Sequence, residues 1–342
     1  MLQNKKVVFD KAWEVSLHTE ELDDSNIPDG SVLLKKIYSI ISTGTELACL
    51  SGNEGWFKMP SVPGYACVGE IVKCGPKVEG YKAGDKILCY GNHSLYETIP
   101  AKGIFMPVPH GFDLKWVPFI RMATIAATAV RTSVIELGDY AAVCGQGLVG
   151  NMAMQLATLQ GARVIAVDVA DNRLEAAKKC GAALTINSAS RDALEAVKNF
   201  TGGKGVSTLI DATGISELDV KNVEWVAQNG EMIFLGSPRG VYETNVTPFL
   251  NRVHLAPFNV TLKGAHEWKF PINKNPFVKH SLERNSELMF DLIARKKIIL
   301  EPLLSEVASP SDCSAVYANL RDKKDQYMGV LFDWSELVPK LG

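Results

Sequence analysis

Short apolar runs alternate with stretches of helical periodicity through the middle of the chain. The apolar runs have the length and composition of buried strands, and they are Ala141–Cys144, Arg163–Val167, Leu184–Ile186, Ser207–Ile210, Met232–Leu235 and Val260–Leu262. The helical stretches between them include Val149–Leu159, Asn172–Lys179, Arg191–Phe200 and Leu218–Ala227. Strands that alternate with helices build βαβ units, whose strands pair in parallel. We therefore predict an α/β fold with a doubly wound parallel sheet over residues 122–262.

The flanking segments have a different pattern. Before residue 122 the chain is rich in glycine and proline, and its strand-like runs include Lys6–Phe9, Ser31–Tyr38, Val68–Val72 and Lys86–Cys89. This pattern predicts a small all-β, barrel-like module. After residue 262 an aromatic and proline-rich loop precedes two predicted helices, at about 282–295 and 309–320. We expect this last segment to rejoin the β module.

Composition places the chain among globular proteins with two domains. Of its 342 residues, 46% are hydrophobic and 22% are charged. The 36 Lys and Arg against 38 Asp and Glu give a net charge of -2, so we expect no nucleic-acid partner. No run of about 18 apolar residues predicts a membrane span. The 7 cysteines contain no C-x-x-C pair, which indicates free thiols in a reducing compartment, and we expect a cytoplasmic protein.

A glycine-rich stretch lies between the first predicted strand and the first helix of the α/β domain. It is Gly145-Gln146-Gly147-Leu148-Val149-Gly150, and it fits the pattern G-x-G-x-x-G in the strand-to-helix context that gives the pattern its meaning. The first glycine permits a tight turn, the second lets the backbone approach a pyrophosphate, and the third lets the helix pack on the strand. The sequence therefore predicts a dinucleotide site of the Rossmann type. A simple strand-to-helix turn is the alternative.

Asp168 ends the second predicted strand and favours NAD as the cofactor. A carboxylate at this place accepts hydrogen bonds from the ribose hydroxyls of adenosine and repels a 2′-phosphate. The alternative is that Asp168 caps the next helix. Arg173 could reach the same ribose or be solvated. Thr213 and Gly236 follow the fourth and fifth strands, at the carboxyl ends where ligands of such sheets bind, so we include them in the predicted cofactor site.

The order of these modules resembles the medium-chain dehydrogenase/reductase superfamily over essentially the whole chain. The resemblance also rests on Pro63-Gly64-Tyr65, Gly69-Glu70, Gly84-Asp85, Lys263-Gly264 and Leu300-Glu301-Pro302-Leu303. It implies a discontinuous GroES-like catalytic domain of residues 1–121 and 263–342 and an NAD-binding Rossmann domain of residues 122–262. It further implies an active site in the cleft between the two domains and a homodimer or homotetramer.

The chain departs from the zinc-dependent members of this superfamily. Their catalytic zinc ligands correspond here to Thr43, Tyr65 and Thr124, and neither threonine nor tyrosine is an ordinary ligand of Zn²⁺. The four-cysteine zinc loop expected after Tyr90 is also missing, so we predict a zinc-free member. The stretch Ile41–Glu46 together with Tyr65 resembles a branch that includes bacteriochlorophyllide 3-hydroxyethyl dehydrogenases and sugar-pathway relatives.

Without zinc, side chains must manage the proton that leaves an alcohol. Tyr65 is the first candidate for general acid/base, although a phenol with an ordinary pKa near 10 needs a cation or the nicotinamide charge nearby to act as a base. Its alternative role is a wall of the pocket. Thr45 matches the hydroxyl that relays the proton in zinc-dependent members. Glu46 could orient Thr45, act as the base or be a buried acceptor. His93 lies in a loop that faces the cleft in relatives, although a lone loop histidine is usually a surface residue.

Four residues are predicted to bind the substrate. Trp56, Phe57 and Trp268 could line the cleft, because aromatic faces stack on the C–H faces of sugars, and packing roles are the alternative. His266 begins the segment that returns to the first domain near the nicotinamide in relatives.

The sequence thus predicts a zinc-independent, NAD-dependent oxidoreductase that acts on a secondary alcohol or ketone of a small sugar- or polyol-like substrate. Three alternatives stay open. The chain could be a hydroxyethyl-tetrapyrrole dehydrogenase, a zinc-free enoyl or quinone reductase, or a sensor that binds NAD(H) without turnover. The enoyl or quinone reductases usually favour NADPH, which Asp168 opposes.

Overall fold

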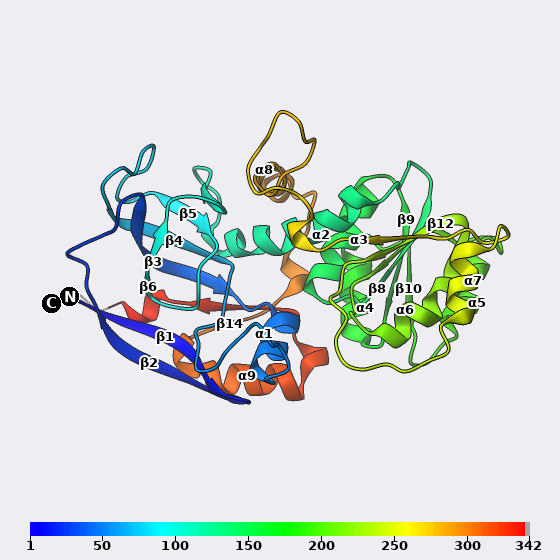
Figure 1. Cartoon of the computed structure of the whole chain (residues 1–342), viewed down its shortest axis with the longest axis horizontal. Helices are drawn as coiled ribbons and strands as arrows, with labels where there is room; N and C mark the ends of the chain where they lie inside the picture. The colour runs from blue at the N-terminus through cyan, green and yellow to red at the C-terminus, as the bar shows by residue number, and fades with distance from the viewer. Residues whose placement is uncertain (339–342) are drawn as a thin grey trace. The chain divides into compact units, whose positions relative to one another are not determined.

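The computed structural model describes residues 1–338 (Figure 1). Contacts between residues divide the chain into two compact units, one formed by Met1–Arg121 with the segment from Leu304 onward, the other by Met122–Leu303. The chain passes from the first unit to the second inside helix α2 (Val117–Thr132). The first unit is rich in strands, and the second alternates strands with helices.

The second unit contains a six-stranded parallel sheet. Its strands are β8 (Tyr140–Cys144), β9 (Arg163–Asp168), β10 (Leu184–Asn187), β11 (Val206–Asp211), β12 (Val226–Phe234) and β13 (Thr261–Gly264). Their order is β10-β9-β8-β11-β12-β13, so the chain moves outward from β8 to β10 and then crosses to β11. Ligands of such sheets bind outside the carboxyl ends of the strands where the order reverses. The predicted doubly wound sheet is confirmed.

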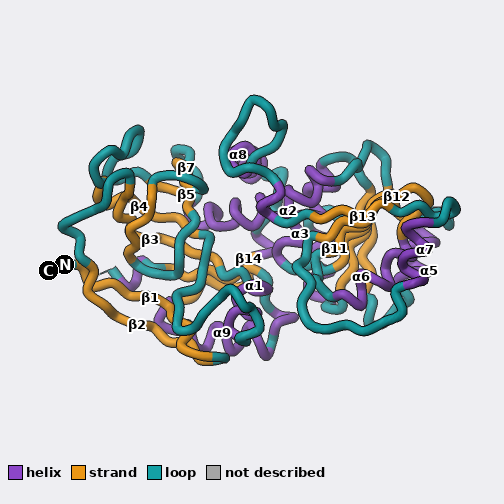
Figure 2. The backbone as a smooth tube through the Cα atoms, in the orientation of Figure 1, coloured by secondary structure: helices purple, strands orange, loops and turns teal. Residues whose placement is uncertain are grey.

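Helices cover both faces of this sheet. Helices α3 (Leu148–Leu159) and α4 (Asp171–Lys179) lie on one side. Helices α5 (Ala193–Phe200), α6 (Ser216–Asn222) and α7 (Thr247–His254) lie on the other (Figures 1 and 2). Strand residues such as Ile165 and Leu209 are fully buried, as expected when both faces of a parallel sheet are covered.

The fifth strand begins earlier than the sequence predicted. We expected a helix through Ala227 and a strand from Met232, but β12 already begins at Val226. Asn229 takes a left-handed backbone conformation with φ 61°, and the pairing of β12 with β11 shifts register just before this strand becomes regular. Asn229 and Gly230 therefore lie at an irregularity inside a strand and do not follow the end of a helix.

The first unit holds a hairpin and a seven-stranded sheet. The hairpin is β1 (Leu2–Lys11) and β2 (Glu14–Leu22), and the sheet strands are β3 (Ser31–Ile40), β4 (Cys67–Cys74), β5 (Lys86–Cys89), β6 (Tyr96–Pro100), β7 (Phe105–Pro107), β14 (Leu304–Ala308) and β15 (Gly329–Asp333). Strand β3 is central and pairs with β4, β6 and β15. Helices α1 (Thr43–Leu50) and α9 (Cys313–Asp322) pack together in this unit. The GroES-like, β-rich part of the predicted fold is confirmed.

Residues 263–303 group with the second unit, whereas we assigned 263–342 to the first. Helix α8 (Leu282–Ala294) bonds to α2, because the hydroxyls of Ser286 and Thr124 lie 3.3 Å apart. Further along, the backbone of Ile299 bonds to the side chain of Gln155 on α3 at 2.8 and 3.0 Å. These bonds hold the segment on the α/β unit, and the chain rejoins the β-rich unit at Leu304.

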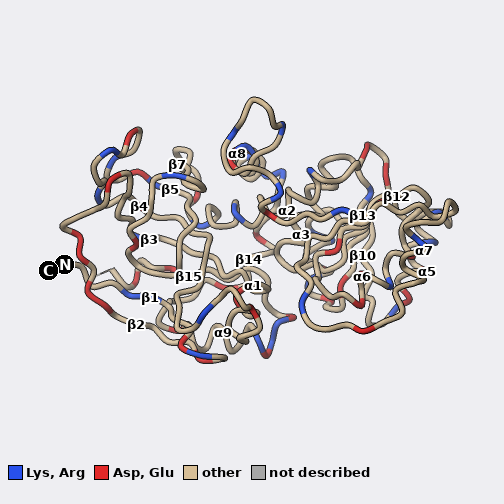
Figure 3. Tube along the Cα trace, in the orientation of Figure 1, with Lys and Arg blue, Asp and Glu red and all other residues tan. Residues whose placement is uncertain are grey.

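Charges of both signs are interspersed along the chain in both units (Figure 3). This distribution accords with the small net charge. Within residues 1–338, no helix combines the length and the apolar character needed to cross a bilayer.

Candidate active site

The glycine-rich loop joins β8 to α3 in a conformation that requires glycine at two positions. Gly145 has φ +84°, in the left-handed region. A Cβ on Gly150 would lie 1.8 Å from the carbonyl oxygen of Gly145, so no larger residue fits there. Gly147 is the N-cap of α3, and the space beside its Cα is open. The loop therefore turns tightly and leaves room beside a helix N-terminus, as a bound pyrophosphate requires.

The three other residues of this loop are buried or half-buried. Gln146 is fully buried, and its side-chain amide donates a hydrogen bond to the carbonyl oxygen of Val143 at 2.9 Å. Leu148 is buried and Val149 is half-buried. This burial leaves the backbone N–H groups at the start of α3 as the groups that could contact phosphate.

Asp168 is bonded directly to the glycine-rich loop. Its Oδ2 accepts a hydrogen bond from the backbone N–H of Gln146 at 2.6 Å, and its Oδ1 accepts from Val169 and Ala170 at 2.8 and 3.0 Å. A guanidinium nitrogen of Arg173 lies 3.8 Å from the same carboxylate. The N-cap of α4 is Ala170, not Asp168. The structure thus brings together the carboxylate predicted to bind ribose and the loop predicted to bind phosphate.

Two carboxyl groups, those of Asp211 at the end of β11 and Asp219 on α6, were not among the site residues predicted from the sequence. Asp211 accepts hydrogen bonds from the hydroxyl of Thr213 at 2.7 Å and from the backbone N–H of Gly214 at 3.0 Å. Asp219 on α6 hydrogen-bonds to Asp211, and burial, followed by the charge of Asp211, raises the pKa of Asp219 to about 7. Asp219 is therefore the member that carries the shared proton. It stands in a polar helical stretch that gives no sequence signal of burial.

Thr213 and Gly236 lie at adjacent strand ends, as predicted. Gly236 follows β12, and a Cβ on it would lie 2.3 Å from the backbone nitrogen of Gly214. The segments after β11 and β12 therefore touch through backbone, and only glycine permits the approach at Gly236.

Glu46 is the centre of a buried hydrogen-bond network in the first unit. It lies in the first turn of α1 and is 2% exposed. Its carboxylate accepts hydrogen bonds from the backbone N–H of Ser42 at 2.7 Å, from the hydroxyl of Tyr317 and from Nε2 of His93 at 3.1 Å. Of the three roles considered for Glu46, this geometry matches the buried acceptor.

His93 is fully buried, which the usual behaviour of a lone loop histidine did not suggest. Its Nδ1 lies 2.7 Å from the hydroxyl oxygen of Ser39, and that oxygen also accepts a hydrogen bond from Nε1 of Trp334 at 2.9 Å. Both ring nitrogens of His93 are therefore engaged inside the unit. The histidine is fixed between Glu46 and Ser39.

Tyr65 reaches the same network from a half-buried position. Its hydroxyl donates a hydrogen bond to the side-chain oxygen of Ser42. The backbone N–H of Ser42 in turn donates to the Glu46 carboxylate. The Tyr65 ring stacks on Tyr90 with centroids 5.6 Å apart. The guanidinium carbon of Arg121 lies 5.8 Å from the Tyr65 centroid and 5.7 Å from that of Tyr90. The cation that a tyrosine base would need thus lies beside the ring.

Arg121 is a residue that the sequence analysis missed, although a signal existed. It is 1% exposed and stands inside the apolar run of α2, Val-Pro-Phe-Ile-Arg-Met-Ala. A single arginine in such a run indicates a buried charge, and buried charges are retained where they have a partner or a function. Thr45 lies half-buried on α1, next to Glu46 in the chain.

The residues predicted to bind substrate lie in different surroundings. Trp56 is 66% exposed, and its Nε1 donates to Glu54 at 2.8 Å. Phe57 is half-buried and packs against Phe9, with ring centroids 5.8 Å apart. Phe57 therefore matches the packing alternative, while Trp56 presents an exposed aromatic face.

His266 and Trp268 belong to the second unit. His266 is exposed and begins a short 3-10 helix, where its Nδ1 accepts a hydrogen bond from the backbone N–H of Trp268 at 3.4 Å. Trp268 is 45% exposed. The two residues thus form a local turn with one exposed aromatic ring.

The residues at the family's zinc positions do not fit a zinc ion. Thr43, Tyr65 and Thr124 offer hydroxyl oxygens, whereas protein zinc sites use thiolate, imidazole or carboxylate. Over residues 1–338, the structure has no group of three or more His, Cys, Asp or Glu side chains able to hold a metal ion.

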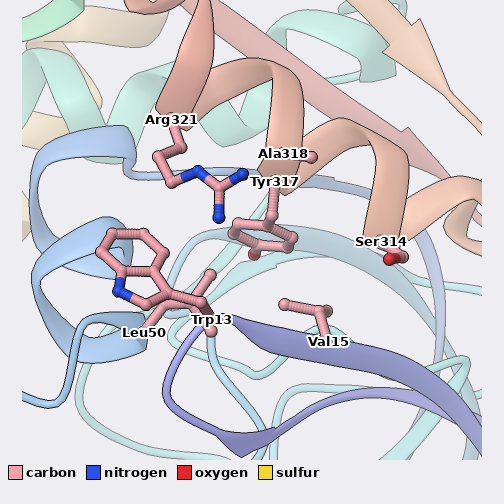
Figure 4. A pocket seen from close by; sticks show the side chains of 7 residues that line it. All are labelled: Trp13, Val15, Leu50, Ser314, Tyr317, Ala318 and Arg321. Atoms are coloured by element: carbon pink, nitrogen blue, oxygen red, sulfur yellow. The ribbon is translucent and has the colours of Figure 1, made fainter.

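A small cavity of about 110 Å³ lies apart from these residues in the first unit (Figure 4). It is lined by Trp13, Val15, Leu50, Ser314, Tyr317, Ala318 and Arg321. Tyr317, which lines this cavity, also donates a hydrogen bond from its hydroxyl to buried Glu46. The cavity therefore adjoins the hydrogen-bond network around Glu46. The guanidinium carbon of Arg321 lies 5.4 Å from the centroid of the Trp13 ring.

The chain combines a GroES-like β unit with a Rossmann-type α/β unit that carries a glycine-rich loop. This combination is the domain organisation of a class of two-domain dehydrogenases. Two family models match the chain: the alcohol dehydrogenase GroES-like domain over residues 28–105 and the zinc-binding dehydrogenase over residues 149–270. The chain belongs to the medium-chain dehydrogenase/reductase superfamily.

Two curated relatives are identical to this chain at somewhat more than a quarter of the aligned positions. The chain is 29% identical to D-guloside 3-dehydrogenase of Escherichia coli K12 over 285 residues, which cover 79% of this chain and 77% of the relative. It is 26% identical to sorbitol dehydrogenase of Bacillus subtilis 168 over 268 residues, which cover 68% and 75%.

Solved structures share the fold. Galactitol-1-phosphate dehydrogenase of Escherichia coli matches with a TM-score of 0.83 and 19% identity, covering 96% of this chain and 99% of that one. A dehydrogenase of Sinorhizobium meliloti 1021, solved with NADP, matches with 0.81 and 21%, covering 97% and 100%. An alcohol dehydrogenase of Escherichia coli CFT073, solved with NADH, matches with 0.80 and 19%, covering 97% and 99%.

Proposed function

We propose that this chain is a zinc-independent dehydrogenase that transfers a hydride between NAD and the secondary alcohol or ketone carbon of a small sugar- or polyol-like substrate. The observation that carries the proposal is the bond between the Asp168 carboxylate and the backbone N–H of Gln146. It joins a carboxylate suited to ribose hydroxyls to the open glycine-rich loop suited to a pyrophosphate. The structural neighbours include one solved with NADP and one solved with NADH, so Asp168 is the reason for choosing NAD.

The glycine-rich loop and Asp168 would hold the cofactor, which would supply a hydride acceptor for alcohol oxidation or a hydride donor for ketone reduction. The proton is the protein's task. We assign it to Tyr65, whose phenol oxygen would give a proton to a ketone oxygen or, as phenolate, take one from the alcohol. The Ser42 hydroxyl fixes the phenol oxygen, and the Arg121 guanidinium beside the ring stabilises negative charge on it.

Glu46 and His93 act as positioning residues in this proposal. Glu46 holds the backbone of Ser42, and His93 and Tyr317 hold Glu46 from behind. Because Glu46, His93 and Tyr317 are buried, the network holds the backbone of Ser42 from the interior of the unit.

The substrate class rests on the relatives. D-guloside 3-dehydrogenase and sorbitol dehydrogenase are named for a sugar derivative and a polyol, and both carry secondary alcohols. Trp56, with its exposed indole, could stack on the C–H face of such a molecule.

The test combines cofactor titration with a substrate screen. NADH and NADPH are titrated against the purified protein by fluorescence, and a panel of glycosides, hexoses and polyols is offered with NAD. We expect NADH to bind at least tenfold more tightly than NADPH and at least one secondary alcohol to be oxidised. A preference for NADPH would contradict the role of Asp168. Tight NADH binding without turnover of any substrate would favour the sensor over the enzyme.

A further inference from the structure

Two cysteines of the first unit lie in contact at the edge of the candidate active site. Cys67 is the first residue of β4 and Cys89 the last residue of β5, and the two are direct partners in the antiparallel register. Their sulfur atoms lie 3.2 Å apart, and both side chains are fully buried. A disulfide joins sulfurs about 2 Å apart between residues whose Cα atoms are near neighbours. A short movement of the two side chains would therefore allow a bond.

An ion pair that includes a buried lysine lies beside these sulfurs. Lys36 of β3 is fully buried and paired with Glu97 of β6. A Cβ placed on Gly91 would lie 2.7 Å from the Glu97 carboxylate, 2.8 Å from the Lys36 ammonium and 2.9 Å from the Cys67 sulfur. The cation, the carboxylate and one thiol thus converge on a single point. A cation next to a thiol favours the thiolate, which is the reactive form.

The two thiols are not equivalent. Burial opposes ionisation of Cys67, but the hydrogen bond with Cys89 and the Lys36 charge outweigh it and lower the pKa of Cys67. The hydrogen bond to Cys67, followed by burial, raises the pKa of Cys89 well above its usual value. Cys67 therefore has the character of the attacking thiolate, and Cys89 that of the thiol that follows.

The pair is joined to the candidate active site along the chain. Cys67 stands two residues after Tyr65, and Cys89 directly precedes Tyr90, whose ring stacks on Tyr65. Glu97 also accepts a hydrogen bond from the backbone N–H of Asn92, next to His93, at 3.0 Å. A change in the distance between the two sulfurs would consequently be passed to the Tyr65–Tyr90 stack.

We propose that Cys67 and Cys89 form a redox-modification site that hydrogen peroxide converts from a dithiol to a disulfide, with a change in the position of Tyr65 and Tyr90. The Cys67 sulfur attacks one peroxide oxygen, the O–O bond breaks, and the leaving hydroxide takes the thiol proton to give water and a sulfenic acid. The Cys89 sulfur then attacks the Cys67 sulfur, the S–O bond breaks, and the second hydroxide leaves as water with the Cys89 proton. The two thiols lose two electrons, and the peroxide is reduced to two waters.

The modification itself is tested without reference to catalysis. The folded protein is exposed to excess hydrogen peroxide, free thiols are then blocked, and peptides are mapped by mass spectrometry. We expect a mass loss of two hydrogens in a peptide pair that links Cys67 to Cys89, restored by dithiothreitol. The Cys67→Ser and Cys89→Ser variants should lack this product. Cys74→Ser is the matched control, because Cys74 lies at the other end of β4 and its thiol donates to the Tyr81 carbonyl oxygen; this variant should form the link normally.

The structural consequence has its own measurement. Amide hydrogen exchange of the oxidised and reduced protein should differ by at least twofold in rate in the peptides that contain Tyr65 and Tyr90, and the peptides of the glycine-rich loop should be unchanged. An effect on dehydrogenase activity rests on the proposed function, whereas the link and the exchange difference do not. The proposal is overturned if exposed Met1 becomes sulfoxide while no Cys67–Cys89 link forms, or if the link forms without any change in exchange.

Discussion

The hydroxyl of Tyr65 is the atom on which the proposed chemistry depends. It is fixed on one side by Ser42, and its ring is flanked by Tyr90 and by the Arg121 guanidinium. The polar side-chain atoms of Glu46 and His93 are hydrogen-bonded within the buried network. Tyr65, by contrast, is half-buried. Among the four catalytic candidates, Tyr65 and Thr45 are the ones with partly exposed side chains.

Replacing Tyr65 with phenylalanine removes the proton donor and keeps the ring. We expect kcat to fall by about 10²–10⁴-fold, the usual contribution of a general acid or base, and the Kd for NADH to stay within about twofold. Steady-state kinetics on the best substrate and fluorescence titration of NADH measure the two effects. Tyr90→Phe serves as the control, because it keeps the stacked ring and leaves the Tyr65 hydroxyl in place. Unchanged kcat in Tyr65→Phe would remove Tyr65 from the mechanism.

In the proposed function, the Asp168 carboxylate determines the choice between NAD and NADP. The Asp168→Asn variant keeps an oxygen that can accept from the Gln146 backbone and removes the negative charge that repels a 2′-phosphate. We expect the preference for NADH over NADPH, measured as the ratio of Kd values, to fall by about 10–100-fold, a change of about 1.4–2.7 kcal/mol in differential binding. Asp171→Asn, at the start of α4, is the control and should keep the ratio. The same loss of preference in both variants would indicate a general charge effect.

At the scale of elements, hydrophobic periodicity was sufficient to predict the parallel sheet. It was insufficient to predict the buried hydrogen-bond network around Glu46. The central strands β8 and β9 are buried on both faces over most of their length, so each is a nearly continuous apolar run that the sequence displays. The network joins Glu46, His93 and Tyr317, which lie far apart in the chain and meet only when α1, α9 and the sheet pack together. No local pattern encodes such a meeting. Arg121 was detectable, because a charge inside an apolar helix is itself a local anomaly.

The ends of β11 and α6 carry a testable pH dependence through Asp219. In the unfolded chain this carboxyl has its usual pKa, about 3.9, and in the folded chain its pKa is about 7. Between these values the folded state binds one more proton than the unfolded state, so the free energy of unfolding falls as the pH rises from about 4 to about 7. Above pH 7 both states are ionised and the penalty is constant.

The Asp219→Asn variant cannot ionise and therefore escapes this penalty. We expect it to be more stable than the wild type by about 1–3 kcal/mol at pH 8 and close to the wild type at pH 4, as measured by thermal unfolding at both values. Titrating groups that do not contact Asp219 cancel in the difference between variant and wild type. Glu217→Gln on the same helix is the control, because its side chain is 47% exposed and pairs only with Lys221 at the surface. A stability difference that is equal at the two pH values would mean that Asp219 does not carry the proton.

At the scale of the whole molecule, two units of different construction share one chain, and the chain crosses between them twice. The first crossing lies inside a continuous helix, next to Arg121, which is also where the sequence analysis divided the chain. The return lies at Leu304, beyond the segment that begins at His266. That segment is held on the α/β unit by side-chain bonds such as those of Gln155, which periodicity does not reveal.

The proposed independence from zinc applies to the whole chain, because a structural or catalytic ion can be held by any suitable group of donors and not only at the family's zinc positions. No disulfide joins the described cysteines, and no cluster of metal-binding side chains occurs within residues 1–338. We expect protein expressed in zinc-supplemented medium to contain well below one zinc per chain after purification. Dialysis against a chelator should then leave the thermal midpoint, NADH binding and turnover unchanged, while a zinc-dependent alcohol dehydrogenase treated in parallel loses activity. One zinc per chain, with stability or turnover lost on its removal, would show that donors outside the family's usual positions hold the ion. In that case the proton would no longer have to be managed by Tyr65 alone.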